Sequence, residues 1–181
     1  MTGRFPLGRW LGAGLLVAAS AACSEDALPP PPDASAHTPE PPADPVDDPQ
    51  RPPRGQAAIE AWLAAGHHRG WACEVLLSAP RLSGNHGPHR ICSNRALADN
   101  AAGFFPVGAA SVKELFHPDG RPNGFAVGLK VEAGEGPQTW YWYERRGERP
   151  TAPPLAQGVA VPDCAVCHGT APRDYVFLRA P

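Results

Sequence analysis

Residues 164–168 read Cys-Ala-Val-Cys-His, and few folds can accommodate the chemistry that this spacing implies. Cys-x-x-Cys-His is the attachment signature of c-type haem. Two thiols three positions apart, on a chain that is starting to turn, can each form a thioether with one of the two vinyl groups of a porphyrin. His168 then falls under the iron as its proximal ligand. The sequence therefore predicts one covalent haem c, attached at Cys164 and Cys167.

The two cysteines of this segment also have two other interpretations. A thioredoxin-type redox pair belongs to cytosolic chains with a βαβ pattern, and neither condition holds here. Half of a zinc site would need a second pair of cysteines at a matching spacing, and Cys73 and Cys92 are too far apart to provide one. Haem attachment is therefore the interpretation that the motif favours.

The length and composition divide the chain into parts. A chain of 181 residues allows one ordinary domain with accessory segments. The formal net charge of -2 gives no basic surface, so no nucleic-acid partner is predicted. The 24 prolines are too many for one compact domain, and they are unevenly placed.

Residues 1–22 are predicted to be an export signal. Arg4 and Arg9 give a positively charged start, and the apolar, small-residue stretch at 11–22 is too short to span a bilayer. We therefore expect an exported protein of the bacterial cell envelope, in the periplasm or at the outer membrane.

The signal ends Ser-Ala-Ala-Cys at residues 20–23, which resembles a bacterial lipobox. In such a motif the cysteine is acylated and becomes the mature N-terminus, although Ser20 stands where leucine is usual. The alternative is ordinary cleavage after a small-x-small triplet, which leaves Cys23 as a free thiol. Of five cysteines, two hold haem and two can pair, so Cys23 is the odd one. A lipoprotein is favoured, because a free thiol would be exposed in an oxidising compartment.

Residues 23–55 are predicted to form a tether. Proline runs alternate with Asp, Glu and Ala, and there is almost nothing to bury. Such a segment is an extended, semi-rigid spacer. It would hold a haem-binding domain at 56–181 away from a membrane that the protein contacts only through its lipid anchor.

The folded part begins with a predicted helix at 56–66, because Ile59, Trp62 and Leu63 recur at i, i+3 and i+4 on one face. A short apolar strand follows at 71–78.

A loop rich in Gly, Pro, Asn and His follows this strand, and regular structure is predicted again at 90–92. Cys73 and Cys92 would pair across this loop, and closing it is worth about 3 kcal/mol in chain entropy. The alternative is two buried thiols. His86 and His89 lie in the loop and are the histidines best placed to approach a cofactor, although its turn composition favours the surface.

A short helix is predicted at 94–100, with Asn94 as its N-cap. After it the apolar period becomes two, at 107–116 and again at 125–132, and an aromatic strand follows at 139–143. Short turns between these strands indicate an antiparallel meander. The predicted fold class is mainly β (α+β): an antiparallel sheet with a few short helices and a C-terminal Cys-x-x-Cys-His haem segment.

The ligation of the iron is restricted by the absence of methionine. The only methionine is Met1, which leaves with the signal, so His/Met ligation is excluded. The sixth position is then open, or filled by His, Lys or water. This chain also differs from small electron-carrying cytochromes in its fold and in the place of its motif. Those proteins are mainly helical and usually carry the haem motif near the start of the chain.

Several motifs, specific in combination, follow one another over nearly all of residues 70–181. The chain resembles the cytochrome P-460 family, and the resemblance is carried by Phe-Pro-x-Gly at 105–108, Ser-Val-Lys-Glu-Leu at 111–115, Gly-Leu at 128–129, the aromatic strand, and Cys-x-x-Cys-His followed by Asp-Tyr-Val-Phe at 174–177. This resemblance implies a dimeric β domain in which a lysine is joined covalently to the haem edge. It also implies a five-coordinate iron and a protein that oxidises hydroxylamine or binds nitric oxide.

By position, Lys113 matches the cross-linking lysine of the family. The alternating pattern agrees at one point, because it places Lys113 on the same strand face as Ser111 and Leu115. The alternative is a lysine that protects an edge strand from pairing. Arg90 occupies the place of an arginine near the family's distal pocket.

One departure from the family concerns the residue after Gly-Leu. Members that oxidise hydroxylamine have a carboxylate there, which would accept protons, whereas this chain has Lys130. Glu132 shares a strand face with Lys130 and would substitute for that carboxylate. The alternative for both is a solvated sheet face. Phe104 and Phe105 would cap the distal side, as in the related beta-type cytochromes c-prime. Those proteins lack the lysine link and bind gases. The alternative is that the two phenylalanines belong to the core.

These patterns predict an exported mono-haem protein that oxidises hydroxylamine or a related small nitrogen compound. It would act as a homodimer and pass electrons to an acceptor cytochrome. One alternative is a cytochrome that binds nitric oxide or another gas without turnover. The other is an electron carrier, which would need a sixth ligand from His86, His89 or His117.

Overall fold

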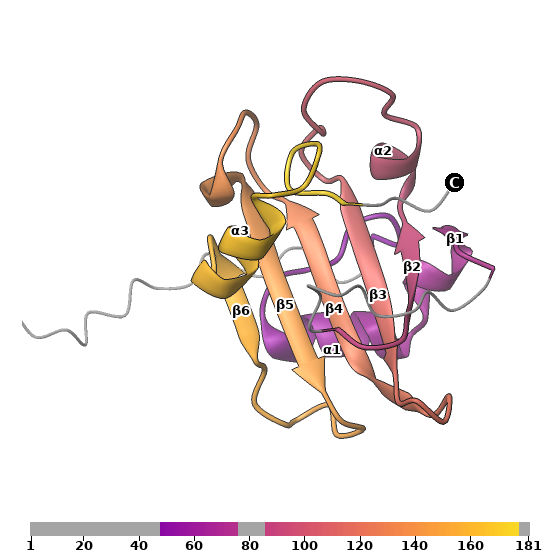
Figure 1. The fold of residues 1–181 in the computed structure, drawn as a ribbon. Coiled ribbons are helices and arrows are strands. Elements are labelled where there is room, and N and C mark those ends of the chain that lie inside the picture. The colour runs from indigo at the N-terminus through magenta and orange to yellow at the C-terminus, as the bar shows by residue number, and fades with distance from the viewer. Residues whose placement is uncertain (1–47, 76–85, 178–181) are drawn as a thin grey trace, which may run out of the picture. The chain divides into compact units, whose positions relative to one another are not determined.

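A computed structural model describes residues 48–75 and 86–177 (Figure 1). The predicted export signal, Cys23 and most of the predicted tether lie outside the described residues. The described chain forms one antiparallel sheet of six strands in the order β1-β2-β3-β4-β5-β6. Strands that are neighbours in sequence are neighbours in the sheet, so the topology is a meander. The predicted fold class, mainly β with a few short helices, is confirmed.

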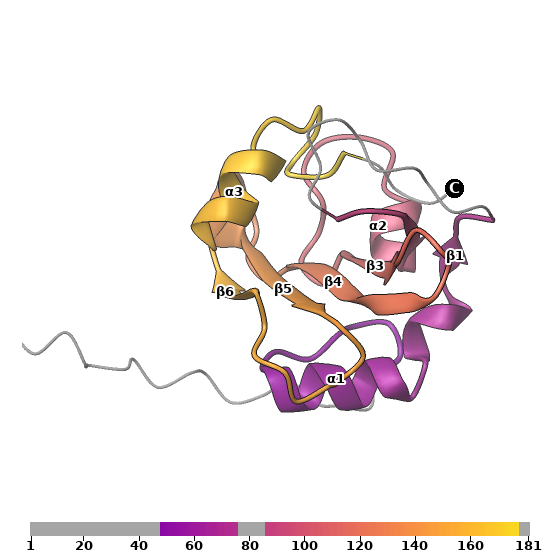
Figure 2. The ribbon, with the colours of Figure 1, turned by 60° about the horizontal axis from the view of Figure 1, so that its bottom comes forward.

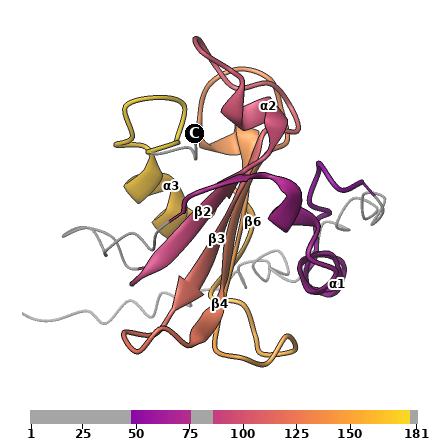
Figure 3. The same ribbon diagram turned by 90° about the vertical axis from the view of Figure 1, so that its right-hand side faces the viewer.

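The strands are β1 (Ala72–Cys73), β2 (His89–Ser93), β3 (Ala110–Phe116), β4 (Pro122–Lys130), β5 (Trp140–Arg146) and β6 (Ala156–Val159). The α-helices are α1 (Gln56–Ala64), α2 (Arg95–Ala98) and α3 (Pro162–His168), and two 3-10 helices are η1 (His67–Gly70) and η2 (Pro137–Thr139). Figure 3 shows the sheet nearly edge-on, with α1 on one side and α3 on the other.

The main core lies between α1 and the sheet (Figure 2). The predicted apolar face of α1 packs against alternate residues of β3, β4 and β5, and the side chains that meet there include Ile59, Trp62, Leu63, Val112, Val127, Leu129, Tyr141 and Tyr143. Because strand side chains alternate between faces, the intervening residues point to the side that carries α3. The helix ends at Ala64, two residues before the predicted boundary, and Gly66 follows in the left-handed region at φ 74°.

The folded domain starts before the predicted boundary at residue 56. Pro52 and Pro53, which the sequence placed in the tether, are buried. Three backbone carbonyls of this segment accept hydrogen bonds from domain side chains: Asp48 from Trp62 at 3.0 Å, Pro49 from Trp71 at 2.9 Å and Gln50 from Asn94 at 2.7 Å. The last residues of the predicted tether are therefore part of the domain.

The predicted pairing of Cys73 with Cys92 is confirmed as a disulfide, across directly paired positions of β1 and β2. A disulfide of this kind is consistent with an extracytoplasmic protein. Within residues 48–75 and 86–177, every helix is too short to cross a membrane.

Candidate cofactor site

The predicted haem segment folds into α3. Pro162 opens this helix, where its missing N–H costs nothing. Cys164, Cys167 and His168 stand at positions i, i+3 and i+4, which lie on one face of a helix. All three line a cavity of about 570 Å³, a size typical of small-molecule sites.

The sheet supplies the other wall of this cavity. Two rows of paired residues cross β3, β4 and β5 there: Ser111, Gly128 and Trp142 in one row, and Lys113, Ala126 and Glu144 in the other. In both rows the β4 residue is small, so the central strand presents little side-chain volume to the cavity. The indole of Trp142 occupies the space next to Gly128.

The imidazole of His168 is held in one orientation. Its Nδ1 lies 2.7 Å from the carbonyl oxygen of Tyr175. A carbonyl only accepts hydrogen bonds, so Nδ1 carries the proton and Nε2 keeps its lone pair for a metal. Histidines that bind metals usually have such a partner for the second nitrogen. The ring centroids of Trp142 and Phe177 lie 4.4 and 5.5 Å from that of His168.

Burial also keeps this imidazole neutral. It lowers the pKa of His168 to about 4, and the positive charge of Lys113 contributes to the same effect. A neutral imidazole is the form that coordinates iron.

The two thiols of α3 differ in their environments. Cys164 packs at the edge of a second core around Phe105 and Trp140, and burial raises the pKa of its thiol to about 11. Cys167 is exposed, and both are free cysteines. The pair has not formed a disulfide, so both sulfurs are available for thioether bonds.

Lys113 lines the same cavity as the haem segment. It lies on β3, and the predicted shared face with Ser111 holds, because both residues contribute to the cavity wall. The structure therefore brings together the residues predicted to attach the haem, to ligate its iron as the proximal ligand and to form the cross-link: Cys164, Cys167, His168 and Lys113. The covalent link of Lys113 to the haem stays a prediction.

Glu144 is a charged residue of the cavity wall that had no predicted role there. Glu144 accepts a hydrogen bond from Nε of Arg146 at 2.9 Å, and one of its oxygens lies 3.4 Å from Nδ1 of His86. Burial alone would raise the pKa of Glu144, but His86 and Arg146 outweigh it and hold this pKa below the usual range. Glu144 follows Trp142 by two residues, so period-two spacing places both on one face. Which strand residues lie beside it depends on the register, which the sequence does not reveal.

Arg90 is not near the cavity, contrary to expectation. It pairs in register with Glu114 and donates from Nε to that carboxylate at 2.7 Å. Glu114 also lies 3.0 Å from Nε2 of the buried His68, on the face that α1 covers. Alternation along β2 explains the difference, because Arg90 shares its face with Cys92, which belongs to the main core.

The other expected distal residues also lie away from the cavity lining that the structure describes. Phe104 is exposed, and Phe105 is buried in the second core against Trp140. Glu132 is exposed just beyond the end of β4. Lys130 is fully buried in an ion pair with Asp174. It therefore lies neither on a solvated face nor in the distal wall.

Of the three candidate sixth ligands, His86 is the one that lines the described cavity. Its ring centroid lies 6.4 Å from that of His168. His89 is buried at the start of β2, where its Nδ1 is 2.8 Å from the carbonyl oxygen of Gly87. Burial lowers the pKa of His89.

The residues present fit a c-type haem. Two free thiols and a histidine with an available Nε2 share one helix face, and they line one cavity with Lys113 and the sheet. The indole nitrogen of Trp142 is buried and has no hydrogen-bond partner among the described residues, as expected of a group that a bound polar substituent would satisfy.

No protein-family model matches the chain, and neither a curated protein nor a solved structure has detectable similarity to it. The resemblance to the cytochrome P-460 family therefore stays a prediction from the motifs.

Proposed function

We propose that this chain is an exported c-type mono-haem protein of the cytochrome P-460 kind that oxidises hydroxylamine or a related small nitrogen compound. One observation carries the proposal: Lys113 lines the same cavity as Cys164, Cys167 and His168. A lysine in that cavity is what a haem cross-link requires, and the motif on α3 is what covalent haem attachment requires.

When bound, the haem would supply an iron that binds a small nitrogen compound and exchanges electrons with it. Cys164 and Cys167 would hold the haem through thioether bonds, and His168 would ligate the metal through Nε2. Tyr175 would keep the ligand oriented through its carbonyl oxygen. Lys113 would bond to the edge of the ring and restrain it.

Glu144 is the carboxylate best suited to accept protons from the substrate. It lines the cavity, and Arg146 and His86 keep it ionised. In the family, the residue after Gly-Leu is a carboxylate that accepts protons. This chain has Lys130 at that position, paired with Asp174, so Glu144 would take the role of the missing carboxylate. The electrons would pass to an acceptor cytochrome.

The proposed setting is the bacterial cell envelope, with the protein anchored by a lipid on Cys23 and acting as a homodimer. The lipobox-like sequence supports the anchor, and the disulfide supports an oxidising compartment.

A second candidate function is binding of nitric oxide or another gas without turnover. The observation in its favour is that Arg90 and Glu132 lie away from the cavity, while Leu155 and Val161 line it. Without Arg90 and Glu132, the cavity has fewer polar groups than the sequence predicts, and this favours a neutral diatomic ligand. Electron transfer is a third candidate, for which His86 would have to reach the iron.

The deciding experiment is a protease digest of the full-length protein produced with haem-attachment machinery. We expect one haem peptide that contains both the 164–168 segment and Lys113. Lys130, the only other lysine in the sequence, serves as an internal control and should be recovered unmodified. Lys113→Ala should keep haem on its thioethers, shift the absorption spectrum towards an ordinary five-coordinate c-type form and lower hydroxylamine oxidation, while nitric oxide binding survives.

Two results would change the assignment. An unmodified Lys113, with the same spectrum in wild type and Lys113→Ala, would favour the gas-binding function. Haem that acid and organic solvent extract intact would show that no thioether forms, and the whole proposal would fail.

A further inference from the structure

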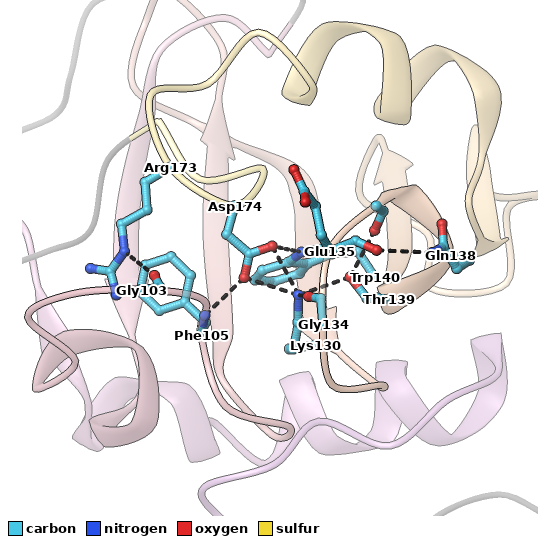
Figure 4. A network of polar contacts seen from close by, with 11 residues as sticks. Gly103, Phe105, Lys130, Gly134, Glu135, Gln138, Thr139, Trp140, Arg173 and Asp174 are labelled. Carbon is cyan, nitrogen blue, oxygen red and sulfur yellow. Dashed lines mark hydrogen bonds and ion pairs between the residues drawn. The ribbon is translucent and has the colours of Figure 1, made fainter.

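The most completely buried charges of the described domain lie next to the haem segment. Lys130 and Asp174 have fully buried side chains, and Nζ of Lys130 lies 2.8 and 2.9 Å from the two oxygens of Asp174. Nζ also donates to Oγ1 of Thr139 at 2.8 Å and to the carbonyl oxygen of Gly134 at 2.7 Å (Figure 4). Every proton of the ammonium group therefore has an acceptor.

Asp174 connects this ammonium to two further elements. It accepts a hydrogen bond from the backbone nitrogen of Phe105 at 2.8 Å and another from Nε1 of Trp140 at 3.2 Å. Figure 4 shows the carboxylate between Lys130 and Phe105. The segment that follows α3 is thus attached to β4, to β5 and to the loop before β3 through one side chain.

The backbone at this point is in a conformation that needs such support. Asp174 and Tyr175 have φ angles of 39° and 65°, in the left-handed region that non-glycine residues rarely adopt. Each such residue carries backbone strain and persists where surrounding contacts hold it. The turn is closed by a hydrogen bond from the nitrogen of Val176 to the carbonyl oxygen of Arg173 at 2.8 Å.

The strained turn carries the carbonyl group that orients the proximal histidine. Tyr175 directly follows Asp174, and its carbonyl oxygen accepts the hydrogen bond from Nδ1 of His168. A change in the φ angle of either residue would turn that carbonyl away. Trp140 gives a second route, because it donates to Asp174 and stacks on Trp142, whose ring lies against His168.

Stability alone is a poor reason for a charge pair in this position. Removing two charges from water costs nearly as much as their attraction returns, so apolar replacement of a buried pair is often neutral or stabilising. The contribution of this pair is more readily understood as geometric. It fixes one conformation of a turn that would otherwise relax.

We infer that Lys130 and Asp174 are positioning residues for His168: the ion pair holds the 173–176 turn so that the carbonyl of Tyr175 fixes the tautomer and orientation of the imidazole. The part of this inference that concerns iron rests on the proposed function. A hydrogen bond at Nδ1 makes Nε2 a stronger donor, so its loss should weaken ligation of ferric iron and raise the reduction potential.

The first test measures the reduction potential of the full-length haem protein. Asp174→Asn and Lys130→Met should each raise it by about 59 mV or more, which corresponds to the roughly tenfold loss of ligand affinity that follows removal of an outer-shell partner. The double variant Lys130→Met/Asp174→Asn leaves no unpaired charge and should fold, yet it should show the same increase. A potential equal to that of wild type in the double variant would overturn the inference.

Glu60→Gln is the matched control. Glu60 and Arg145 form another buried ion pair, with Nε 2.6 Å from the carboxylate, on the face of the sheet that α1 covers. Glu60→Gln should lower the free energy of unfolding and leave the potential unchanged. An equal increase in this control would assign the effect to general loosening of the domain and overturn the positioning role.

A second measurement does not depend on haem. In the full-length chain with Cys164→Ser and Cys167→Ser, nitrogen NMR of ¹⁵N-labelled histidine should show His168 as a single Nδ1–H tautomer. Adding Lys130→Met/Asp174→Asn should replace it with a mixture of tautomers, whereas adding Glu60→Gln should not. A single Nδ1–H tautomer in all three chains would overturn the inference. If haem does not attach to the wild type, the proposed function fails, and this measurement still decides the positioning role.

Discussion

Trp142 covers Gly128 across the β4–β5 pair, so closely that a Cβ atom at position 128 would lie 3.1 Å from Cζ3 of the indole. The same indole lies 4.4 Å from His168 between ring centroids. The sheet wall of the cavity and the imidazole of His168 are therefore coupled through one side chain, and the absence of a side chain at Gly128 sets where that indole rests.

Gly128→Ala should displace Trp142 and disturb the haem environment. An overpacked core position costs about 1–3 kcal/mol, and the displaced ring has His168 as its neighbour. We expect a lower yield of haem protein and a changed absorption spectrum, measured beside urea unfolding. Gly70→Ala is the control, because a Cβ there meets no atom within 4 Å. A spectrum for Gly128→Ala that matches wild type would show that Trp142 does not transmit the change.

Cys164 should be a slow nucleophile in the folded, haem-free chain. Burial raises the pKa of its thiol to about 11, and thiolates are the reactive form. At about pH 8 the thiolate fraction should be lower, on the order of 100-fold, than that of an ordinary thiol of pKa about 8.5. Alkylation of Cys167→Ser chains, followed by mass spectrometry of the peptide, should be slower by that factor when folded than in urea.

The exposed Cys167 provides the comparison for this experiment. In Cys164→Ser chains, it should react at similar rates with and without urea, because it is already accessible. Equal rates for Cys164 in the two conditions would contradict the buried position of its sulfur.

The Cys73–Cys92 disulfide should contribute substantially to stability. Its cysteines are 19 residues apart, and cross-links over such loops are worth about 2–5 kcal/mol. Cys73→Ala/Cys92→Ala should lower the free energy of unfolding in urea by this amount. A reductant should destabilise the wild type and leave the double variant unaffected, and equal sensitivity of the two proteins would argue against the bond.

Glu114 should make the domain sensitive to acid. Burial alone would raise its pKa, but the hydrogen bonds from His68 and Arg90 outweigh burial and hold the pKa below the usual range. Since the folded pKa lies below the unfolded value of about 4.3, this stabilisation is present above that value and is lost as pH falls through the folded pKa. Glu114→Gln should lose less stability than wild type between about pH 5 and pH 3. Glu132→Gln, at an exposed carboxylate, should behave as wild type.

Much of the fold could be predicted because its signals are local. The apolar spacing at 56–66 and the period of two along β4 were sufficient to assign α1 and that strand. Asn94 caps α2 as predicted, with its side chain accepting from the nitrogen of Leu97 at 3.0 Å. β6 was missed, because Ala-Gln-Gly-Val has neither alternation nor a run of β-formers, and it is a strand only because β5 offers a free edge.

The grouping of Cys164, Cys167 and His168 could be predicted from the sequence, whereas the side chains that line the opposite wall of the cavity could not, for a physical reason. Cys164, Cys167 and His168 lie in five consecutive residues, so their relation depends only on the local helix. The positions of the other wall residues depend on strand register and on contacts between distant segments. Lys130 shows this most clearly, because its partner Asp174 is 44 residues away and nothing in either local sequence indicates the pair.

The order of elements has a consequence for how the protein is made. All six strands lie between Ala72 and Val159, and α3 begins afterwards, at Pro162. A polypeptide is synthesised from its N-terminus. Both rows of the cavity wall, including Lys113, therefore leave the ribosome before Cys164 does. The helix that carries the thiols is thus the last element of the candidate site to be made, after every strand that lines the cavity with it.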